Sequence, residues 1–220
     1  MAYFPLFVEL QGRRALIVGG GRLALHKAEK LLPYGAELRA VAPEFCPELQ
    51  ALPGVELRRG AFEPRDLDGV FLAIAATDDR DVNSAVASAC RERGIPVNVV
   101  DELSECGFVF PALLRRGALS AGVTTAGCSP SAAAWARDRL DEALPEGFED
   151  ILAFLGSLRA PLKARVPEQR RRSALLRELF GLCLELGRPL DAAELDAALE
   201  ARALAGASTS WGLAAAGRSC

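Results

Sequence analysis

The 220-residue sequence has little histidine, no excess of positive charge and no long apolar run. Its one histidine, His26, leaves mainly carboxylates and thiols as groups that could hold a metal ion, and we predict no metal site. Lysine and arginine number 26 against 29 aspartates and glutamates, which argues against a general nucleic-acid binder. No apolar run approaches the roughly 18 residues of a membrane span, and the start MAYFPLFVEL lacks the basic residues of a signal peptide. These absences predict a cytoplasmic protein that binds neither nucleic acid nor membrane.

Paired cysteines and well-placed tyrosines are also lacking. The six cysteines are scattered and form no C-x-x-C pair, so we interpret them as reduced thiols. Tyr3 and Tyr34 are the only tyrosines, and neither stands where a reductase of small metabolites would place a Tyr/Lys catalytic pair. This disfavours a reductase of that kind.

Short apolar runs alternate with helix-like segments through the first half of the chain. The runs have the length of buried strands, and the longer segments between them carry apolar residues at helical spacing and end at glycine. This alternation predicts an α/β fold, with a doubly wound, mostly parallel sheet of Rossmann type. Strands are expected over 13–19, 36–43, 54–60, 69–79 and 95–101, and helices over 22–35, 47–52 and 80–94.

The pattern changes in the second half. The run 107–127 predicts two strands joined near Gly117, and 129–145 predicts a helix that Ser129 caps. The apolar faces of the helices that follow need a partner, either the core or a second subunit. These helices are expected over 148–163, 168–186 and 191–204.

The glycine-rich segment GGGRLA (19–24) connects the first expected strand to the first helix and fits G-x-G-x-x-A. In such a motif the first glycine allows the tight turn, the second lets the backbone approach a pyrophosphate, and the small last residue lets helix and strand pack closely. The N–H groups at the helix start then face the phosphates. A glycine turn used only for packing is the alternative, but the strand–loop–helix context favours a dinucleotide site.

The end of the second strand departs from the usual pattern. An acidic residue that binds the ribose normally stands there, whereas this strand ends at Ala42 and Pro43, and Glu44 follows. Glu44 either reaches a ribose hydroxyl or favours the first turn of the next helix. No arginine stands at this strand end to receive a 2′-phosphate, which an acid would repel. We therefore predict NAD rather than NADP.

Three ordered segments together resemble the dehydrogenase–ferrochelatase part of siroheme synthase. They are FPLFVELQGRRALIVGGGRLALHKAEKLL, LAIAATDD and VNVVDELSECGFVFPALLRRGALSAGVTTAGCSP, and the resemblance covers roughly residues 3–145. It implies NAD-dependent oxidation of precorrin-2 to sirohydrochlorin; many members also insert ferrous iron to give siroheme. It also implies a homodimer whose substrates are tetrapyrroles.

The same resemblance implies a division of the chain. We expect an NAD-binding Rossmann domain over 1–112, a dimerisation region over 113–147 and a helical domain over 148–205. The tail 206–220 is rich in small residues and is expected to be disordered.

The resemblance also assigns site residues. It gives Asp101, in the segment NVVD, the catalytic role, and it places Thr125 where some members have a serine. Ala126 replaces a glycine of the family motif, which puts any regulation attached to a serine here in doubt. The residues expected to contact the cofactor are Gly19, Gly20, Gly21, Arg22, Leu23, Pro43, Glu44, Thr77, Asp78 and Asp79.

Chemistry supports a role for Asp101 independently of the resemblance. Asp101 is expected to end a strand at the carboxyl edge of the sheet, where open α/β folds place their sites. Oxidation of the macrocycle releases a hydride and a proton, and a carboxylate is a suitable proton acceptor. Iron insertion releases pyrrole protons that the same carboxylate could take. The alternative is that Asp101 merely begins the following turn.

Basic residues are expected to meet the carboxylates of the substrate. Arg115 and Arg116 precede the predicted turn, and we assign them, with Thr125, to substrate binding. The run Arg170–Arg172 fits a solvated helix face better than a binding site.

A nucleotide-sensing Rossmann module without catalysis is the competing hypothesis. A sensor would carry an acid at the end of the second strand and would lack the segment NVVD followed by FVFPA. This sequence shows the reverse, so the enzyme is the preferred interpretation.

Overall fold

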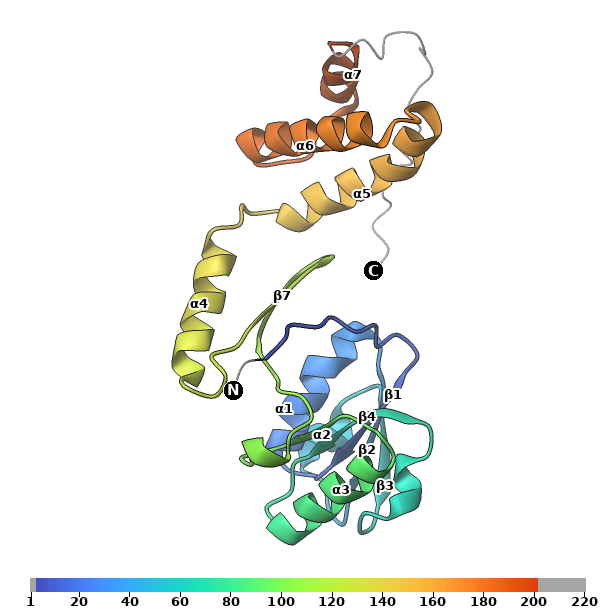
Figure 1. The fold of residues 1–220 in the computed structure, drawn as a ribbon, viewed down its shortest axis with the longest axis vertical. Helices are drawn as coiled ribbons and strands as arrows, with labels where there is room; N and C mark the ends of the chain where they lie inside the picture. The colour runs from blue at the N-terminus through green and yellow to red at the C-terminus, as the bar shows by residue number, and fades with distance from the viewer. Residues whose placement is uncertain (1–2, 202–220) are drawn as a thin grey trace. The chain divides into compact units, whose positions relative to one another are not determined.

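The computed structural model describes residues 3–201, and the chain divides between Pro111 and Ala112 into two units (Figure 1). The predicted tail 206–220 lies outside the described residues.

A five-stranded sheet, all parallel, forms the centre of the first unit (Figure 1). Its spatial order is β3-β2-β1-β4-β5, so the order reverses between β1 and β4. This point of reversal is where doubly wound sheets open a crevice for ligands. The strands are β1 (Arg14–Val18), β2 (Glu37–Ala42), β3 (Val55–Arg59), β4 (Val70–Ala75) and β5 (Val97–Val99).

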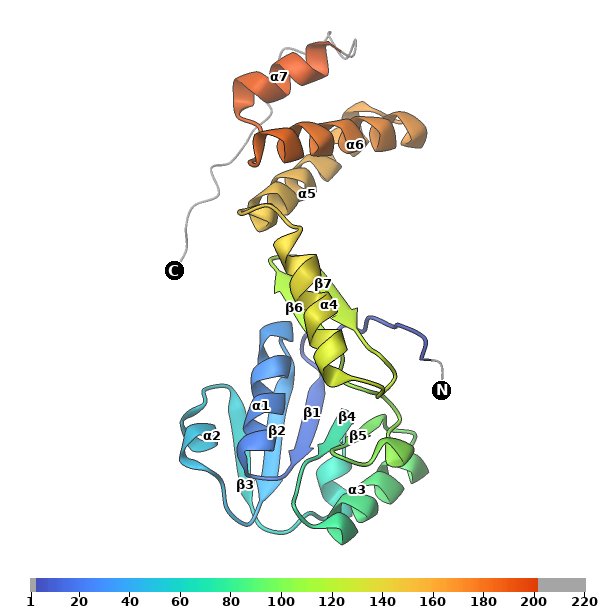
Figure 2. The same ribbon diagram turned by 90° about the vertical axis from the view of Figure 1, so that its left-hand side faces the viewer.

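Helices cover both faces of this sheet, as Figure 2 shows. Alternate residues of each strand face opposite sides: in β4, Ile74 packs with α1 on one side and Ala73 packs with α3 on the other. Because both faces are buried, the inner strands are apolar almost throughout. The helices of this unit are α1 (Arg22–Leu31), α2 (Pro47–Ala51) and α3 (Arg80–Glu92), with 3-10 turns η1 (Leu32–Tyr34), η2 (Pro64–Leu67) and η3 (Leu103–Glu105).

The second unit begins with an antiparallel hairpin of β6 (Ala112–Arg116) and β7 (Leu119–Val123). Its two-residue turn places Gly117 at φ 55°, a left-handed conformation that glycine adopts without strain. Helix α4 (Pro130–Glu142) contacts both strands, and the Ser129 hydroxyl accepts a hydrogen bond from the Ala132 N–H at its start.

Three further helices share a core of their own. They are α5 (Phe148–Arg165), α6 (Gln169–Leu186) and α7 (Ala192–Glu200). Ile151, Leu179 and Leu195 are at most 1% exposed in this core. The two glycines inside these helices, Gly156 and Gly181, have open space where a β-carbon would stand.

The fold class is confirmed, and the differences lie at the ends of elements. The helix expected to run to Gly35 becomes a 3-10 turn at Leu32, because Pro33 follows and donates no hydrogen bond. The strand expected over 95–101 shortens to three residues, since the chain turns after Val99. Asp101 therefore lies in a turn beyond the strand instead of ending it. The two strands expected within 107–127 begin only at Ala112.

Candidate nucleotide-binding and catalytic site

The glycine loop passes so close to other backbone atoms that Gly19 and Gly20 have no room for side chains. A β-carbon on Gly19, whose φ is 138°, would lie 2.3 Å from the Ala76 carbonyl oxygen. A β-carbon on Gly20 would lie 1.8 Å from the Glu44 carbonyl oxygen. The Gly20 carbonyl also accepts a hydrogen bond of 2.8 Å from the Cys46 N–H. The loop therefore packs directly on the chain that follows β2, and it fits the close backbone approach that a dinucleotide requires.

Helix α1 begins at Arg22, immediately after this loop, with Gly21 as its N-cap. No side chain caps the helix and no acid occupies its first turn. Arg22 and Leu23 are exposed. Because the first N–H groups of a helix have no partner within it, this end offers hydrogen-bond donors and a positive dipole end to a phosphate.

The carboxyl end of β2 lies beside an arginine of β3 that the sequence analysis did not place there. Pro43 and Glu44 follow the strand and are exposed, as expected for residues beside a ribose. In the neighbouring strand β3, Arg59 pairs in register with Ala42, and its guanidinium donates to Gln50 over 3.1 Å. An arginine therefore does stand at this end of the sheet, supplied by β3 instead of by β2. Only the strand pairing, which a single sequence does not give, brings it there.

A tight network fixes the turn after β4. The Thr77 hydroxyl and backbone N–H both donate to the Asn83 side-chain oxygen, at 2.8 and 3.2 Å. Asn83, 6% exposed, returns a hydrogen bond from its amide to the Thr77 carbonyl. The Asp79 carboxylate accepts the N–H groups of Asp81 and Val82 at the start of α3. Thr77 and Asp79 are thus held by the protein itself, whereas Asp78, exposed like Asp79, has no such role in this network.

Asp101 lies in an exposed turn with φ 62°, in the left-handed region that few residues other than glycine adopt. Such a conformation persists where surrounding contacts hold it. The Cys106 thiol supplies such contacts, because its sulfur accepts the Val99 N–H at 3.2 Å and lies 3.2 Å from the Val99 carbonyl oxygen. The loop that carries Asp101 is thus closed onto the strand before it.

The sequence did not predict that Lys27 and Asn98 form a polar cluster. Lys27, half-buried on α1, donates from Nζ to Asn98 Oδ1 over 3.4 Å and lies 4.1 Å from the centroid of the Phe110 ring. The Asn98 amide, 7% exposed, donates to the Phe108 carbonyl oxygen at 3.1 Å. Burial lowers the pKa of Lys27, as does repulsion from Lys30, against the attraction of Cys106 and Asp101. In the sequence Lys27 is one more polar residue of an amphipathic helix, so no local signal marks it.

The residues assigned to substrate binding belong to the second unit. Arg116, on β6, forms a 2.7 Å ion pair with Asp141, which raises the pKa of the arginine. The Thr125 hydroxyl donates to the Ser129 carbonyl at 2.9 Å and accepts the Ser129 N–H at 3.0 Å. Ala126 has φ 54°, a conformation that suits the glycine it replaces. Arg116 and Thr125 thus have structural partners within their own unit, whereas the assignment of Arg115, also on β6, stays a prediction.

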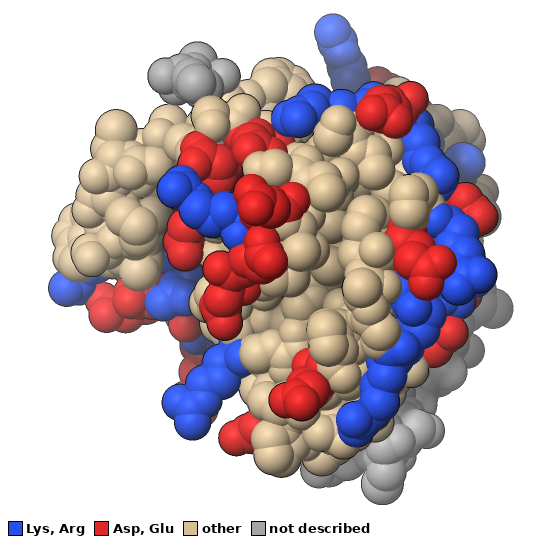
Figure 3. Space-filling view, turned by 90° about the horizontal axis from the view of Figure 1, so that it is seen from below, with Lys and Arg blue, Asp and Glu red and all other residues tan. Residues whose placement is uncertain are grey.

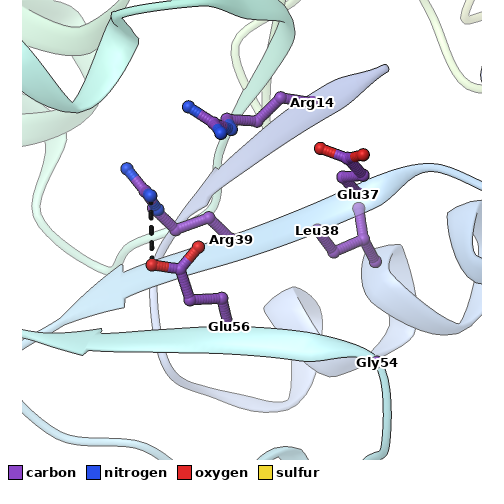
Figure 4. A pocket seen from close by; sticks show the side chains of 6 residues that line it. All are labelled: Arg14, Glu37, Leu38, Arg39, Gly54 and Glu56. Carbon is purple, nitrogen blue, oxygen red and sulfur yellow. Dashed lines mark ion pairs between the residues drawn. The ribbon is translucent and has the colours of Figure 1, made fainter. Parts of the chain in front are cut away.

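His26 and the pocket in Figure 4 lie away from the carboxyl end of the sheet, where the glycine loop and Asp101 stand. His26 is exposed and 3.9 Å from Glu29 on the same helix. A pocket of about 240 Å³ lies at the opposite, amino ends of β1 and β2, where Arg39 pairs with Glu56 at 3.0 Å (Figure 4). Both signs of charge line it, and the strand direction places it away from the glycine loop.

Neither the charged side chains on the face in Figure 3 nor the potential metal ligands of residues 3–201 gather into one site. From below, acidic and basic side chains surround an uncharged central area, and neither sign dominates this face (Figure 3). Within residues 3–201 no three histidine, cysteine, aspartate or glutamate side chains gather as they would around a metal ion. Among the same residues, none of the helices combines the length and the apolar character of a membrane span.

Comparisons with known proteins agree with this geometry. A model of NAD(P)-binding domains, NAD_binding_7, matches residues 6–112. The siroheme synthase of Photorhabdus laumondii is 42% identical over 183 residues, which are 82% of this chain and 39% of that protein. That of Chromobacterium violaceum is 43% identical over 171 residues, 76% of this chain and 36% of that protein. The solved structure of SirC, precorrin-2 dehydrogenase, matches with a TM-score of 0.70 and 26% identity, covering 90% of this chain and 98% of that one.

The parallel sheet, the glycine loop at its point of reversal and the domain match define a Rossmann-type domain that binds a nicotinamide cofactor. The match to siroheme synthases extends well past that domain. The chain belongs to the family of the siroheme synthase N-terminal region, and it spans about two fifths of the siroheme synthase of Photorhabdus laumondii.

Proposed function

We propose that this chain oxidises precorrin-2 to sirohydrochlorin, with NAD as the electron acceptor. The observation that carries the proposal is a glycine loop in which Gly19 and Gly20 have no room for side chains, at the same end of the sheet as the left-handed turn of Asp101. The likeness to SirC, whose name describes a precorrin-2 dehydrogenase, and to siroheme synthases gives the substrate class. When bound, the nicotinamide accepts the hydride that the macrocycle loses.

The backbone would hold the cofactor more than side chains would. We assign the pyrophosphate to Gly19, Gly20, Gly21 and the start of α1 at Arg22 and Leu23, whose N–H groups have the required freedom. Pro43 and Glu44 would line the adenosine ribose, because they follow β2 next to Gly20. The turn of Thr77, Asp78 and Asp79, at the end of β4, would border the other half of the dinucleotide.

Asp101 would accept the proton that leaves the macrocycle together with the hydride. Asp101 is exposed, and the contacts of Cys106 with Val99 close the loop that carries it. The electron pair of the broken C–H bond leaves as hydride, and the N–H or second C–H proton passes to the carboxylate, so charge and atoms balance.

Insertion of ferrous iron into sirohydrochlorin is proposed as a second activity at the same carboxylate. Two pyrrole protons must leave as iron enters, and the exposed Asp101 can accept a proton. Iron is a substrate in this step. Homodimerisation through residues 113–147 and a cytoplasmic location remain part of the proposal. A nucleotide sensor without catalysis is the outcome that the following experiment would favour if no oxidation occurs.

The test separates the charge of Asp101 from its backbone conformation. Under anaerobic conditions, purified protein would be given precorrin-2 and NAD, and sirohydrochlorin would be followed by absorbance before ferrous iron is added. Asp101→Asn keeps a residue that tolerates positive φ but removes the proton acceptor, and it should lower the oxidation rate by about 10²-fold or more. Asp101→Gly should lose the same activity, while its free energy of unfolding stays equal or rises by up to about 1 kcal/mol.

The NAD affinity of both variants should match that of the wild type, because Asp101 lies outside the glycine loop. Full oxidation by Asp101→Asn would remove Asp101 from the mechanism. Absence of oxidation by the wild type, with NAD bound, would overturn the enzyme and leave the sensor.

A further inference from the structure

Lys27 carries a half-buried positive charge without an ion-pair partner. In the described part of the chain, no carboxylate oxygen lies within ion-pair distance of its Nζ. Its contacts are one long hydrogen bond of 3.4 Å to Asn98 Oδ1 and the face of the Phe110 ring. Because an ammonium has three N–H donors, these contacts leave donor capacity unused. A half-buried cation of this kind is suited to an anionic ligand.

The groups around Lys27 hold it in place. The Asn98 amide is occupied on its other side by the Phe108 carbonyl oxygen at 3.1 Å and the Cys106 sulfur at 3.5 Å. Its Oδ1 therefore stays directed at Lys27. The Phe110 ring packs at 5.4 Å from that of Phe108, with the planes tilted by 52°. The ammonium thus sits in a preformed setting, which reduces the entropy lost when a ligand binds.

This cluster lies next to the groups already assigned to the reaction. Lys27 is five residues after the start of α1, so it lies about 7.5 Å along the helix from the phosphate-binding end. Asn98 belongs to β5, and the turn of Asp101 follows that strand directly. The Asp101 carboxylate is near enough to act on the charge of Lys27. A substrate at Asp101 would bring any anionic arm within reach of Lys27.

We propose that Lys27 binds a carboxylate side chain of the tetrapyrrole substrate and so orients the macrocycle at Asp101. The inference rests on the proposed function, because that function supplies a substrate with several carboxylates. A carboxylate would complete the donors of the ammonium and replace the water lost on burial. It would also place the macrocycle beside the cofactor helix, since α1 carries both the glycine loop and Lys27.

The pH dependence of KM distinguishes a role of Lys27 in substrate binding from a role in packing. The titratable groups that act on Lys27 are Lys30 on its own helix and Cys106 and Asp101 in the loop after β5. Because the pKa of Lys27 is lowered, its positive charge is lost at a lower pH than that of an exposed lysine. The KM for the tetrapyrrole should therefore rise on the alkaline side. Arginine at this position keeps its charge throughout that range.

The experiment compares Lys27→Met, Lys27→Arg and Lys30→Met in the 220-residue chain. We would measure kcat and KM for precorrin-2, the Kd for NAD, and the Kd for sirohydrochlorin by absorbance titration. Lys27→Met should raise KM and the sirohydrochlorin Kd by about tenfold or more, the size of a lost charge-assisted contact, with kcat within about threefold. Lys27→Arg should restore most of the affinity and remove the alkaline rise of KM. Lys30→Met is the matched control and should change KM by less than about twofold.

The outcomes separate this inference from the function on which it rests. An unchanged KM and Kd in Lys27→Met would overturn it. So would a fall in kcat at constant KM, which would make Lys27 a positioning residue for Asp101. If the wild type binds sirohydrochlorin without oxidising precorrin-2, the proposed function fails, and the sirohydrochlorin Kd still decides the role of Lys27. Absence of tetrapyrrole binding by the wild type would overturn both.

Discussion

The position of a β-carbon on Gly20 lies 1.8 Å from the carbonyl oxygen of Glu44. That oxygen belongs to the backbone, so it cannot move aside as a flexible side chain would. Gly20→Ala must displace either the loop or the chain after β2, and we expect a loss of about 3 kcal/mol in the free energy of unfolding, at the upper end of overpacking. NAD binding should be lost as well. Chemical denaturation and a fluorescence titration with NAD would measure both effects.

Gly21→Ala provides the comparison for stability. A β-carbon there meets nothing within 4 Å, and φ is −89°, which any residue adopts. Only the preference of glycine over alanine at an N-cap is lost, so the cost should be below about 1 kcal/mol. Equal destabilisation by the two substitutions would contradict the assignment of the clash to Gly20.

The sequence predicts those parts of the fold that depend on local pattern. Apolar runs and glycine stops define the parallel sheet and its helices, and the glycine loop is visible because its motif is contiguous. The features that were missed depend on contacts between distant segments. Arg59 reaches the end of β2 through strand pairing, and Lys27 meets Asn98 across 71 positions. The loop of Asp101 is closed by the contact of the Cys106 thiol with Val99, which no local propensity describes.

Glu44 and Arg59 should set the choice between NAD and NADP in opposite directions. Both lie at the carboxyl ends of β2 and β3, where the adenosine ribose is expected. Glu44→Gln removes the charge that would repel a 2′-phosphate and should raise the ratio of kcat/KM for NADP to that for NAD by about tenfold. The ratio measured with both cofactors checks this expectation.

Arg59→Ala in the Glu44→Gln background should reverse that gain, because it removes the guanidinium available to the phosphate. An unchanged ratio in the double variant would show that Arg59 stays with Gln50, its partner at 3.1 Å, and plays no part in selection.

Glycines inside the helices of the second unit offer a gain in stability. Gly156 in α5 and Gly181 in α6 have normal helical φ and open space at the β-carbon position. Alanine at each should stabilise the protein by about 0.5–1 kcal/mol, because it restricts the unfolded chain and suits a helix better. Urea denaturation would show a higher midpoint for each variant. A lower midpoint would mean that the helix needs the glycine for close packing.

Acid stability should depend on Glu194. Its carboxylate pairs with the two terminal guanidinium nitrogens of Arg188 at 2.7 and 2.8 Å and accepts the Asp191 N–H, which lowers the pKa of Glu194 to about 2 from 4.5. Because the folded-state pKa is depressed, this stabilisation is complete above pH 4.5 and is lost as the pH falls toward 2.

Glu194→Gln should therefore reduce stability at neutral pH and should converge with the wild type near pH 2. Thermal unfolding followed by circular dichroism between pH 2 and 7 would test this. A constant difference across the range would assign the effect to the helix cap at Asp191 instead of to the charge.

The two edge strands of the parallel sheet, β3 and β5, disfavour pairing with a strand of another molecule. At one margin, β3 places Glu56, Arg58 and Arg59 along an edge strand. At the other, β5 has only three residues, and the chain folds back on it through the Gly107 N–H bond to Val97. Charged or very short edge strands resist extension by a strand from another molecule. The nucleotide-binding unit is thereby protected from edge-to-edge aggregation, even in a crowded solution where many copies meet.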